Sequence, residues 1–211
     1  MVRWILLLVI GLSGNSLWAG ELHLEYADFY SHLRKLNGEE LQSLQFAFGF
    51  LHVQSKDLCR VSSVLIDTDK KDIDVPVQSN RRFVLPNEKA LKMAKARLLV
   101  KLEEPQNQCD LSVLLEVKPE LFAEPVNASQ LLSYFHSFEA FFDKMGGFLS
   151  FMMPSPEGLQ ITFNDPTTVP KAFSASAKLV GEHWQIKQED IERLLDTKLS
   201  GIKQITALMP N

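Results

Sequence analysis

The chain has 211 residues, which suits one domain or two small ones, and 45% of them are hydrophobic, enough for a substantial core. Lysine and arginine total 22 against 26 acidic residues, so the formal net charge is −4. This balance argues against nucleic acid as the main partner, because binding to phosphate groups requires a basic face.

The first nineteen residues have the order of a secretory signal peptide. Arg3 supplies the positive charge, Trp4–Leu12 is the apolar run, and Ser13–Ala19 is small and polar. Cleavage after Ala19 would release a mature chain over 20–211 into the periplasm. The apolar run is too short to span a bilayer, and an uncleaved anchor remains the alternative.

The first half of the mature chain is rich in predicted strands. Alternation of apolar residues, or runs apolar on both faces, indicates strands over 22–26, 45–53, 59–66, 73–77, 82–85, 97–103 and 109–117. The segment 45–53 is apolar on both faces and is expected to be a central strand. The last two segments are separated by a short turn and are expected to pair as a hairpin. Helices are predicted over 29–36 and 87–95.

Two cysteines, Cys59 and Cys109, stand near the starts of two of these strands. In an oxidising compartment an even pair of cysteines indicates one disulfide. A metal site would require more thiolates or clustered histidines, and a catalytic cysteine would leave the other one unexplained.

A long amphipathic helix is predicted over 128–153, with a break or kink at Gly146-Gly147. Asn127 and Gln130 have the spacing of a reciprocal cap at its start. An aromatic and methionine stripe marks the buried face, formed by Leu131, Phe135, Phe138, Phe142, Met145, Leu149 and Met152. Two interpretations remain for the end of the helix. The stripe is core throughout, or Phe148, Phe151 and Met153 form a partner or ligand surface.

In the remainder of the chain, strands are predicted over 159–163, 173–180 and 184–186, and a C-terminal helix over 189–199. Residues 202–208 close the chain and are given no assignment. The fold class is therefore α+β: a β-rich first half, forming an antiparallel sheet or a sandwich, with the long aromatic helix and the C-terminal helix packed on it. Residues 20–211 are expected to form a single exported domain, and a subdivision would fall in the proline-bracketed linker at 119–125.

No convergent set of catalytic residues is visible in the sequence. Ser200 and Lys203 have the spacing of a serine acyltransferase motif, but they follow a predicted helix and no KTG strand exists. His136 and Glu139 are three residues apart on the long helix and could share a face, although a solvated polar edge is the more ordinary explanation. No catalytic residue, metal site or cofactor is therefore assigned.

Three stretches of the mature chain carry a resemblance to a known family. They are Asp57–Cys59 (DLC), Gln108–Ser112 (QCDLS) and Met145–Phe163 (MGGFLSFMMPSPEGLQITF). Together with the signal peptide, they resemble a family of uncharacterised exported gammaproteobacterial proteins, catalogued as domain of unknown function 2987. The resemblance implies a periplasmic location and implies no chemistry.

The sequence favours a non-catalytic periplasmic protein that binds a partner or serves as an accessory of the cell envelope. Two alternatives remain open. One is a periplasmic hydrolase whose site is assembled from residues distant in sequence, and the other is a carrier of a small apolar ligand. The expected partner is accordingly a protein or an apolar ligand of the cell envelope.

Overall fold

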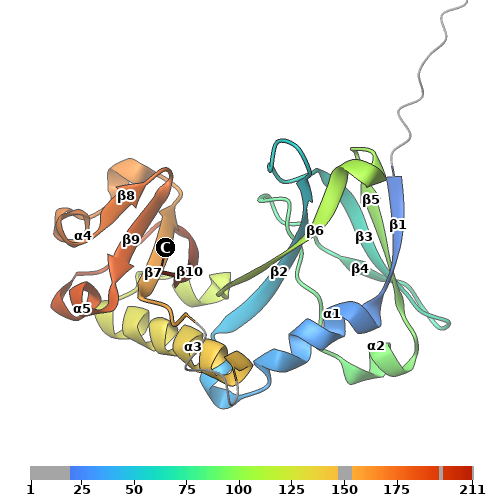
Figure 1. Ribbon diagram of the computed structural model, residues 1–211, viewed down its shortest axis with the longest axis horizontal. Coiled ribbons are helices and arrows are strands. Elements are labelled where there is room, and N and C mark those ends of the chain that lie inside the picture. The colour runs from blue at the N-terminus through green and yellow to red at the C-terminus, as the bar shows by residue number, and fades with distance from the viewer. Residues whose placement is uncertain (1–19, 147–153, 195–196, 211) are drawn as a thin grey trace, which may run out of the picture.

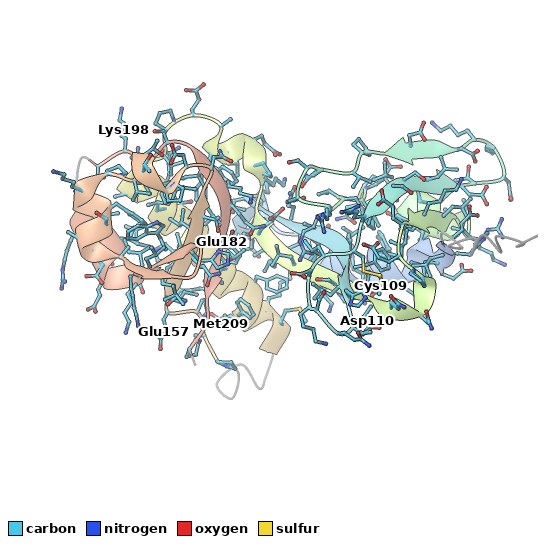
Figure 2. The ribbon with its side chains drawn as sticks, turned by 90° about the horizontal axis from the view of Figure 1, so that it is seen from above. Cys109, Asp110, Glu157, Glu182, Lys198 and Met209 are labelled. Atoms are coloured by element: carbon cyan, nitrogen blue, oxygen red, sulfur yellow. A yellow bond between two sulfur atoms is a disulfide. The ribbon has the colours of Figure 1, made fainter. Side chains whose placement is uncertain are left out.

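The computed structural model describes residues 20–146, 154–194 and 197–210, and they form two lobes side by side (Figures 1 and 2). The first lobe holds the N-terminal strands and their helices, and the second holds the C-terminal strands and the long helix. The chain is α+β, as the sequence predicts. Strands are not confined to its first half, because the second lobe has a four-stranded sheet of its own.

An antiparallel sheet of order β1-β5-β3-β4 forms one wall of the first lobe. Its strands are β1 (Gly20–Glu25), β5 (Arg97–Leu102), β3 (Val61–Asp67) and β4 (Ile73–Val75). Two helices, α1 (Tyr26–Leu33) and α2 (Lys89–Met93), lie along the lower edge in Figure 1. Two 3-10 turns, Arg34–Leu36 and Glu39–Leu41, continue from α1.

A separate two-stranded ribbon runs from the first lobe toward the second. It pairs β2 (Leu44–His52) with β6 (Cys109–Val117) in antiparallel register, with Phe48 opposite Val113. The hairpin expected between 97–103 and 109–117 is therefore wrong, because β5 pairs with β1 and β3 instead. Alternation fixes which face of a strand is buried, but it does not choose the neighbouring strand.

The second lobe is built on an antiparallel sheet of order β10-β7-β9-β8. Its strands are β10 (Ile202–Leu208), β7 (Gly158–Phe163), β9 (His183–Lys187) and β8 (Lys178–Val180). Helices α4 (Lys171–Ser176) and α5 (Gln188–Ile191) accompany the sheet, and a 3-10 turn, Glu192–Leu194, follows α5. Contacts of α5 and this turn with α3 place the C-terminal helical segment against the long helix.

The strand predicted over 173–180 is wrong in its first part, where the chain forms helix α4. Pro170 stands immediately before this helix, and Phe173 is its one buried side chain. In a six-residue stretch rich in alanine and serine, alternation carries little information, and alanine favours the helix. The predicted C-terminal helix is shorter than expected, because its α-helical part spans only Gln188–Ile191.

Helix α3 (Ala128–Gly146) begins as the sequence predicts. The Gln130 backbone N–H donates to Asn127 Oδ1 at 2.9 Å, and the Asn127 backbone N–H donates to Gln130 Oε1 at 3.0 Å. These two bonds satisfy two backbone donors at the helix start. Leu131, Phe135 and Phe138 are at most 1% exposed. The expected continuation over 147–153 lies outside the described residues.

The buried stripe of α3 rotates along the helix. Phe141 is buried near the end, whereas Phe142 is half-buried and Met145 is 37% exposed. A stripe with a strict seven-residue repeat drifts by about 20° per repeat around a straight helix, which explains the shift.

Aromatic side chains connect the two lobes through the ribbon. Phe29 of α1 meets Phe48 edge-on at 5.0 Å between ring centroids, and Phe46 meets Phe141 of α3 at 5.8 Å. Phe46 and Phe48 are 6.4 Å apart on β2 and join these two pairs. The buried apolar residues of both lobes consequently form one continuous core. Edge-to-face aromatic contacts of this kind each contribute about 1 kcal/mol beyond the area they bury.

Candidate functional site

A polar cleft lies between the two lobes, and we call it the interlobe cleft. It comprises two neighbouring pockets of about 390 and 480 Å³ that share Asn80 and Lys203 in their linings. These volumes are in the range of small-molecule sites. The first lobe contributes Leu58, Asn80 and Arg82, and the second contributes Thr162, Glu182 and His183. In Figure 2, Glu182 lies on the side of the second lobe that faces the first.

Arg82 is the most unusual group in the cleft. It is 9% exposed, and it forms no ion pair with any carboxylate among the described residues. Its Nη1 donates to the Ala47 carbonyl and its Nη2 to the Ser112 hydroxyl, both at 3.3 Å. Burial lowers the pKa of the Arg82 guanidinium, and the charge of nearby Glu116 opposes that shift. A cation removed from water without a paired anion is energetically expensive.

Glu116 is a buried carboxylate in the second pocket and is 3% exposed. Its Oε1 accepts from Gln45 Nε2 at 3.0 Å, and its Oε2 accepts from Gln204 Nε2 at 2.7 Å. Gln45 and Glu116 belong to the ribbon, whereas Gln204 lies on β10 of the second lobe. The carboxylate therefore ties the two lobes together beside the cleft. Both of its oxygens are occupied, which indicates a structural role.

Thr162 and His183 form a hydroxyl–imidazole pair on the second-lobe wall. The Thr162 Oγ1 lies 2.7 Å from His183 Nδ1, and Thr162 is 6% exposed. A nucleophile beside a base is the first requirement of a hydrolase. Within the described part of the chain, no carboxylate bonds to the other imidazole nitrogen to orient it. The pair therefore lacks the third member of a catalytic triad.

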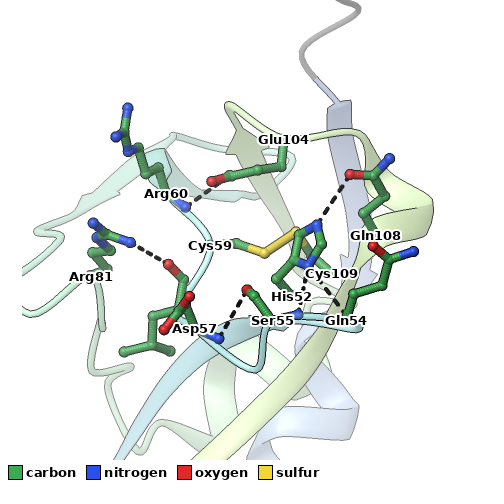
Figure 3. Close-up of a disulfide and its surroundings, with 11 residues drawn as sticks. His52, Gln54, Ser55, Asp57, Cys59, Arg60, Arg81, Glu104, Gln108 and Cys109 are labelled. Carbon is green, nitrogen blue, oxygen red and sulfur yellow. Dashed lines mark hydrogen bonds between the residues drawn. A yellow bond between two sulfur atoms is a disulfide. The ribbon is translucent and has the colours of Figure 1, made fainter.

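The predicted disulfide between Cys59 and Cys109 is present, with the two Cα atoms 6.4 Å apart (Figure 3). It joins the loop after β2 to the first residue of β6. Cys59 and Cys109 are 1% and 8% exposed, so the bond is shielded from solvent. Among the described residues, Glu104 is the one carboxylate that approaches both sulfur atoms closely enough to form a metal-type cluster. A disulfide offers no thiolate, so the cluster does not fit a metal ion.

Polar contacts hold the segments on both sides of the disulfide (Figure 3). The Arg60 backbone N–H donates to Glu104 Oε2 at 2.8 Å. His52 Nε2 lies 3.2 Å from Gln108 Oε1, and His52 Nδ1 accepts from the backbone N–H groups of Gln54 and Ser55. His52 is half-buried and hydrogen-bonded through both ring nitrogens, and these partners leave it no part in a metal site. The disulfide region is thus a structural cross-link.

The other histidine candidate is an exposed pair on α3. His136 Nδ1 and Glu139 Oε2 are 2.8 Å apart and share a face, as their spacing predicts. Both side chains are more than a third exposed. The pair belongs to no three-residue metal cluster in the described ranges 20–146, 154–194 and 197–210. The proposed partner surface of Phe148, Phe151 and Met153 lies outside the described residues.

Sequence reasoning found the disulfide and missed the interlobe cleft. Arg82 follows a second arginine, Glu116 lies near the end of an apolar strand, and His183 opens a short one, so no shared motif links them. Six segments, around residues 58, 80, 114, 162, 183 and 204, meet only when the lobes fold. A charged residue on an apolar strand, as at Glu116, is the one signal that could have suggested a buried polar group.

Comparison with known proteins places the chain in a family. Residues 18–163 match the family model described as protein of unknown function (DUF2987), and the chain belongs to that family. The match covers the whole first lobe, helix α3 and strand β7, and it ends before the other three strands of the second sheet. No curated protein and no solved structure matches the chain. Every helix in the described part of the chain is too short or too polar to cross a membrane.

Proposed function

We propose that the chain is an exported periplasmic protein that binds a small polar ligand, carrying an anionic group, in the interlobe cleft and acts without catalysis. Residues 1–19 support export through a cleaved signal peptide. The Cys59–Cys109 disulfide supports an oxidising compartment. The binding role depends on the cleft.

The observation that carries the binding role is the buried cation of Arg82, which forms no direct ion pair among the described residues. Its side chain, 9% exposed, lines a pocket of about 390 Å³ and forms no direct ion pair with a described carboxylate, although the charge of Glu116 acts on it from nearby. The anions that a guanidinium binds best are the planar carboxylate and the tetrahedral phosphate. Lys203 lines both pockets and adds a second cation. An anion in the cleft would offset the cost of burying Arg82.

The side chains that line the pocket also restrict the chemistry of the rest of the ligand. Asn80, Gln160, Thr206 and Glu182 present amide, hydroxyl and carboxylate groups to the same pocket. Such a lining favours a molecule with several hydrogen-bonding groups. It does not suit a carrier of an apolar ligand, which requires a mostly apolar cavity.

The test compares Arg82→Gln with Arg60→Gln, which removes an exposed cation from the same lobe. The mature protein is titrated with glutamate, citrate and glycerol 3-phosphate as probes of three anion classes, and thermal unfolding is recorded. At least one probe should raise the melting temperature of the wild type and of Arg60→Gln, and it should leave Arg82→Gln unchanged. Equal responses of the two variants to every probe would refute the assignment of Arg82.

Stability without ligand gives a second readout. Removing the guanidinium loses two long hydrogen bonds, worth about 1–3 kcal/mol each at most, but relieves a desolvation penalty of several kcal/mol. Arg82→Gln should therefore change the unfolding free energy by no more than about 1 kcal/mol. A loss well above that value would indicate that Arg82 is a structural group.

The hydrolase alternative depends on the Thr162–His183 pair. It predicts that the mature protein cleaves a chromogenic ester and that Thr162→Val abolishes the cleavage. Binding without turnover, retained in Thr162→Val, would favour the binding role over the enzyme.

A further inference from the structure

A second, independent feature is a basic hollow lined by residues from α1 and the turn after it, from α2 and from the end of α3. These segments lie along the lower edge of the molecule in Figure 1. The hollow encloses about 640 Å³ and is open to solvent. The described residues that line it include no carboxylate. It collects five cations from three separate segments: Arg34, Lys35, Lys89, Lys92 and Lys144.

These five cations lack an anionic partner in the part of the chain that the structure describes. None of them forms an ion pair with any described residue. Lys144 Nζ donates to the Asn37 backbone carbonyl at 2.7 Å, and Lys92 Nζ lies 5.6 Å from the centroid of the Tyr30 ring. The chain as a whole has a formal net charge of −4, so the remainder of the molecule carries −4 − 5 = −9. A cluster of five cations without a carboxylate in its described lining thus lies on one face of an acidic protein.

An exposed apolar side chain stands among the cations. Met93, at the end of α2, is 74% exposed, the highest value among the exposed large hydrophobic residues of the described chain. Met145, at the end of α3, is 37% exposed and lines the same hollow. Lysine side chains that surround exposed apolar groups are typical of surfaces that lie in the interface of an anionic membrane.

We propose that this basic hollow docks the protein on the surface of a membrane that contains anionic phospholipid. The lysines and Arg34 contact headgroup phosphates, and Met93 enters the boundary between headgroups and acyl chains. The proposal is independent of ligand binding in the interlobe cleft, whose described lining shares no residue with the hollow. A vesicle assay can therefore fail while the cleft titration succeeds, and the reverse.

The cations have a structural explanation that the test must separate from docking. Arg34, Lys92 and Lys144 stand near the C-terminal ends of helices, where positive charge is favourable. If that were their whole role, neutralising them would lower stability and leave membrane affinity unchanged. Docking predicts the opposite pattern.

The experiment measures sedimentation of mature protein with vesicles of phosphatidylcholine alone or with about 30% phosphatidylglycerol added. The test variant carries Arg34→Gln, Lys89→Gln and Lys92→Gln. The control carries Lys70→Gln, Lys71→Gln and Lys178→Gln, which make the same change in net charge at exposed lysines outside the hollow. Thermal unfolding of each variant confirms that it is folded.

Wild type and control should bind the anionic vesicles and not the neutral ones. Each basic residue near an anionic surface contributes a factor of about five, so the test variant should bind roughly 100-fold more weakly. Met93→Ser should weaken vesicle binding about 5- to 10-fold without lowering the melting temperature. Equal loss in test and control variants would show that only net charge matters, and would overturn the proposal. Absence of wild-type binding to anionic vesicles, or its abolition by millimolar inorganic phosphate at constant ionic strength, would also overturn it.

Discussion

Reduction of the Cys59–Cys109 disulfide should lower the stability of the protein by a predictable amount. The two cysteines are separated by 50 positions, and in the chain-entropy model opening a loop of that size costs about 4 kcal/mol. A typical domain is stable by about 5–15 kcal/mol, so the bond supplies a large share. For a chain of this size, the loss corresponds to a fall of roughly 8–16 °C in melting temperature.

The structure also fixes how the assay must be done. Cys59 is 1% exposed, so a reductant reaches the bond slowly in the folded protein. Reduction should therefore be carried out in partial denaturant, verified by the mass of the alkylated thiols, and followed by refolding in reductant. The double variant Cys59→Ala, Cys109→Ala is the control, and reductant should leave its melting curve unchanged. If fully reduced protein melts at the temperature of the oxidised form, the chain-entropy argument does not hold for this fold.

Two further predictions concern a close approach between strands and a half-buried histidine. Gly158→Ala should lower the unfolding free energy by about 3 kcal/mol in a urea titration, because the added Cβ would collide with the Ile186 carbonyl oxygen. Gly181→Ala serves as the comparison. Its Cβ would meet open space, and only the positive φ of +62° is unfavourable, so it should cost about 1 kcal/mol. Burial, with a smaller effect of Lys35, lowers the pKa of His32 from its ordinary 6.5. The stability from neutral His32 is therefore present above pH 6.5 and is lost as pH falls toward the lowered pKa. His32→Gln should flatten this part of the stability–pH profile, and an unchanged slope would contradict the assignment.

The sequence predicts where helices and strands lie better than it predicts which strands pair with one another. The start of α3 follows from Asn127 and Gln130, because the two side chains act within four residues of chain. The pairing of β2 with β6 could not be predicted in this way, because Phe48 and Val113 are opposite each other although far apart in sequence. Such pairing depends on which apolar faces meet in three dimensions, and one sequence does not specify that.

The candidate sites are harder still to predict, because most of them combine residues that are distant in sequence. The disulfide was predictable because two cysteines allow only one pairing within the chain. Arg82 belongs to a cleft only because β7, β9 and β10 of the second lobe face it. The basic hollow likewise joins Lys35, Lys89 and Lys144 from three helical segments. Charges spread along a mildly acidic chain give no warning that several of them gather on one face.

The family match ends at Phe163, the last residue of β7, and this boundary leads to a prediction about folding. Strand β7 lies between β10 and β9, both of which follow it in the chain. A protein truncated to residues 20–163 would therefore leave β7 without neighbours. Leu159 and Ile161, each 0% exposed in the intact protein, would lose the cover that follows β7 in the chain, together with Phe163, and would keep only the contacts with α3.

Burying a large apolar side chain contributes about 1.5–3 kcal/mol, so the truncation removes up to roughly 5–9 kcal/mol if all three become fully exposed. That loss is comparable to the entire stability of a typical domain. We expect the protein over 20–163 to bind the dye ANS and to lack a cooperative melting transition, whereas 20–211 should melt cooperatively without binding the dye. A cooperative transition of 20–163 without dye binding would show that the first lobe and α3 fold independently, and that the continuous core between the lobes contributes little to stability.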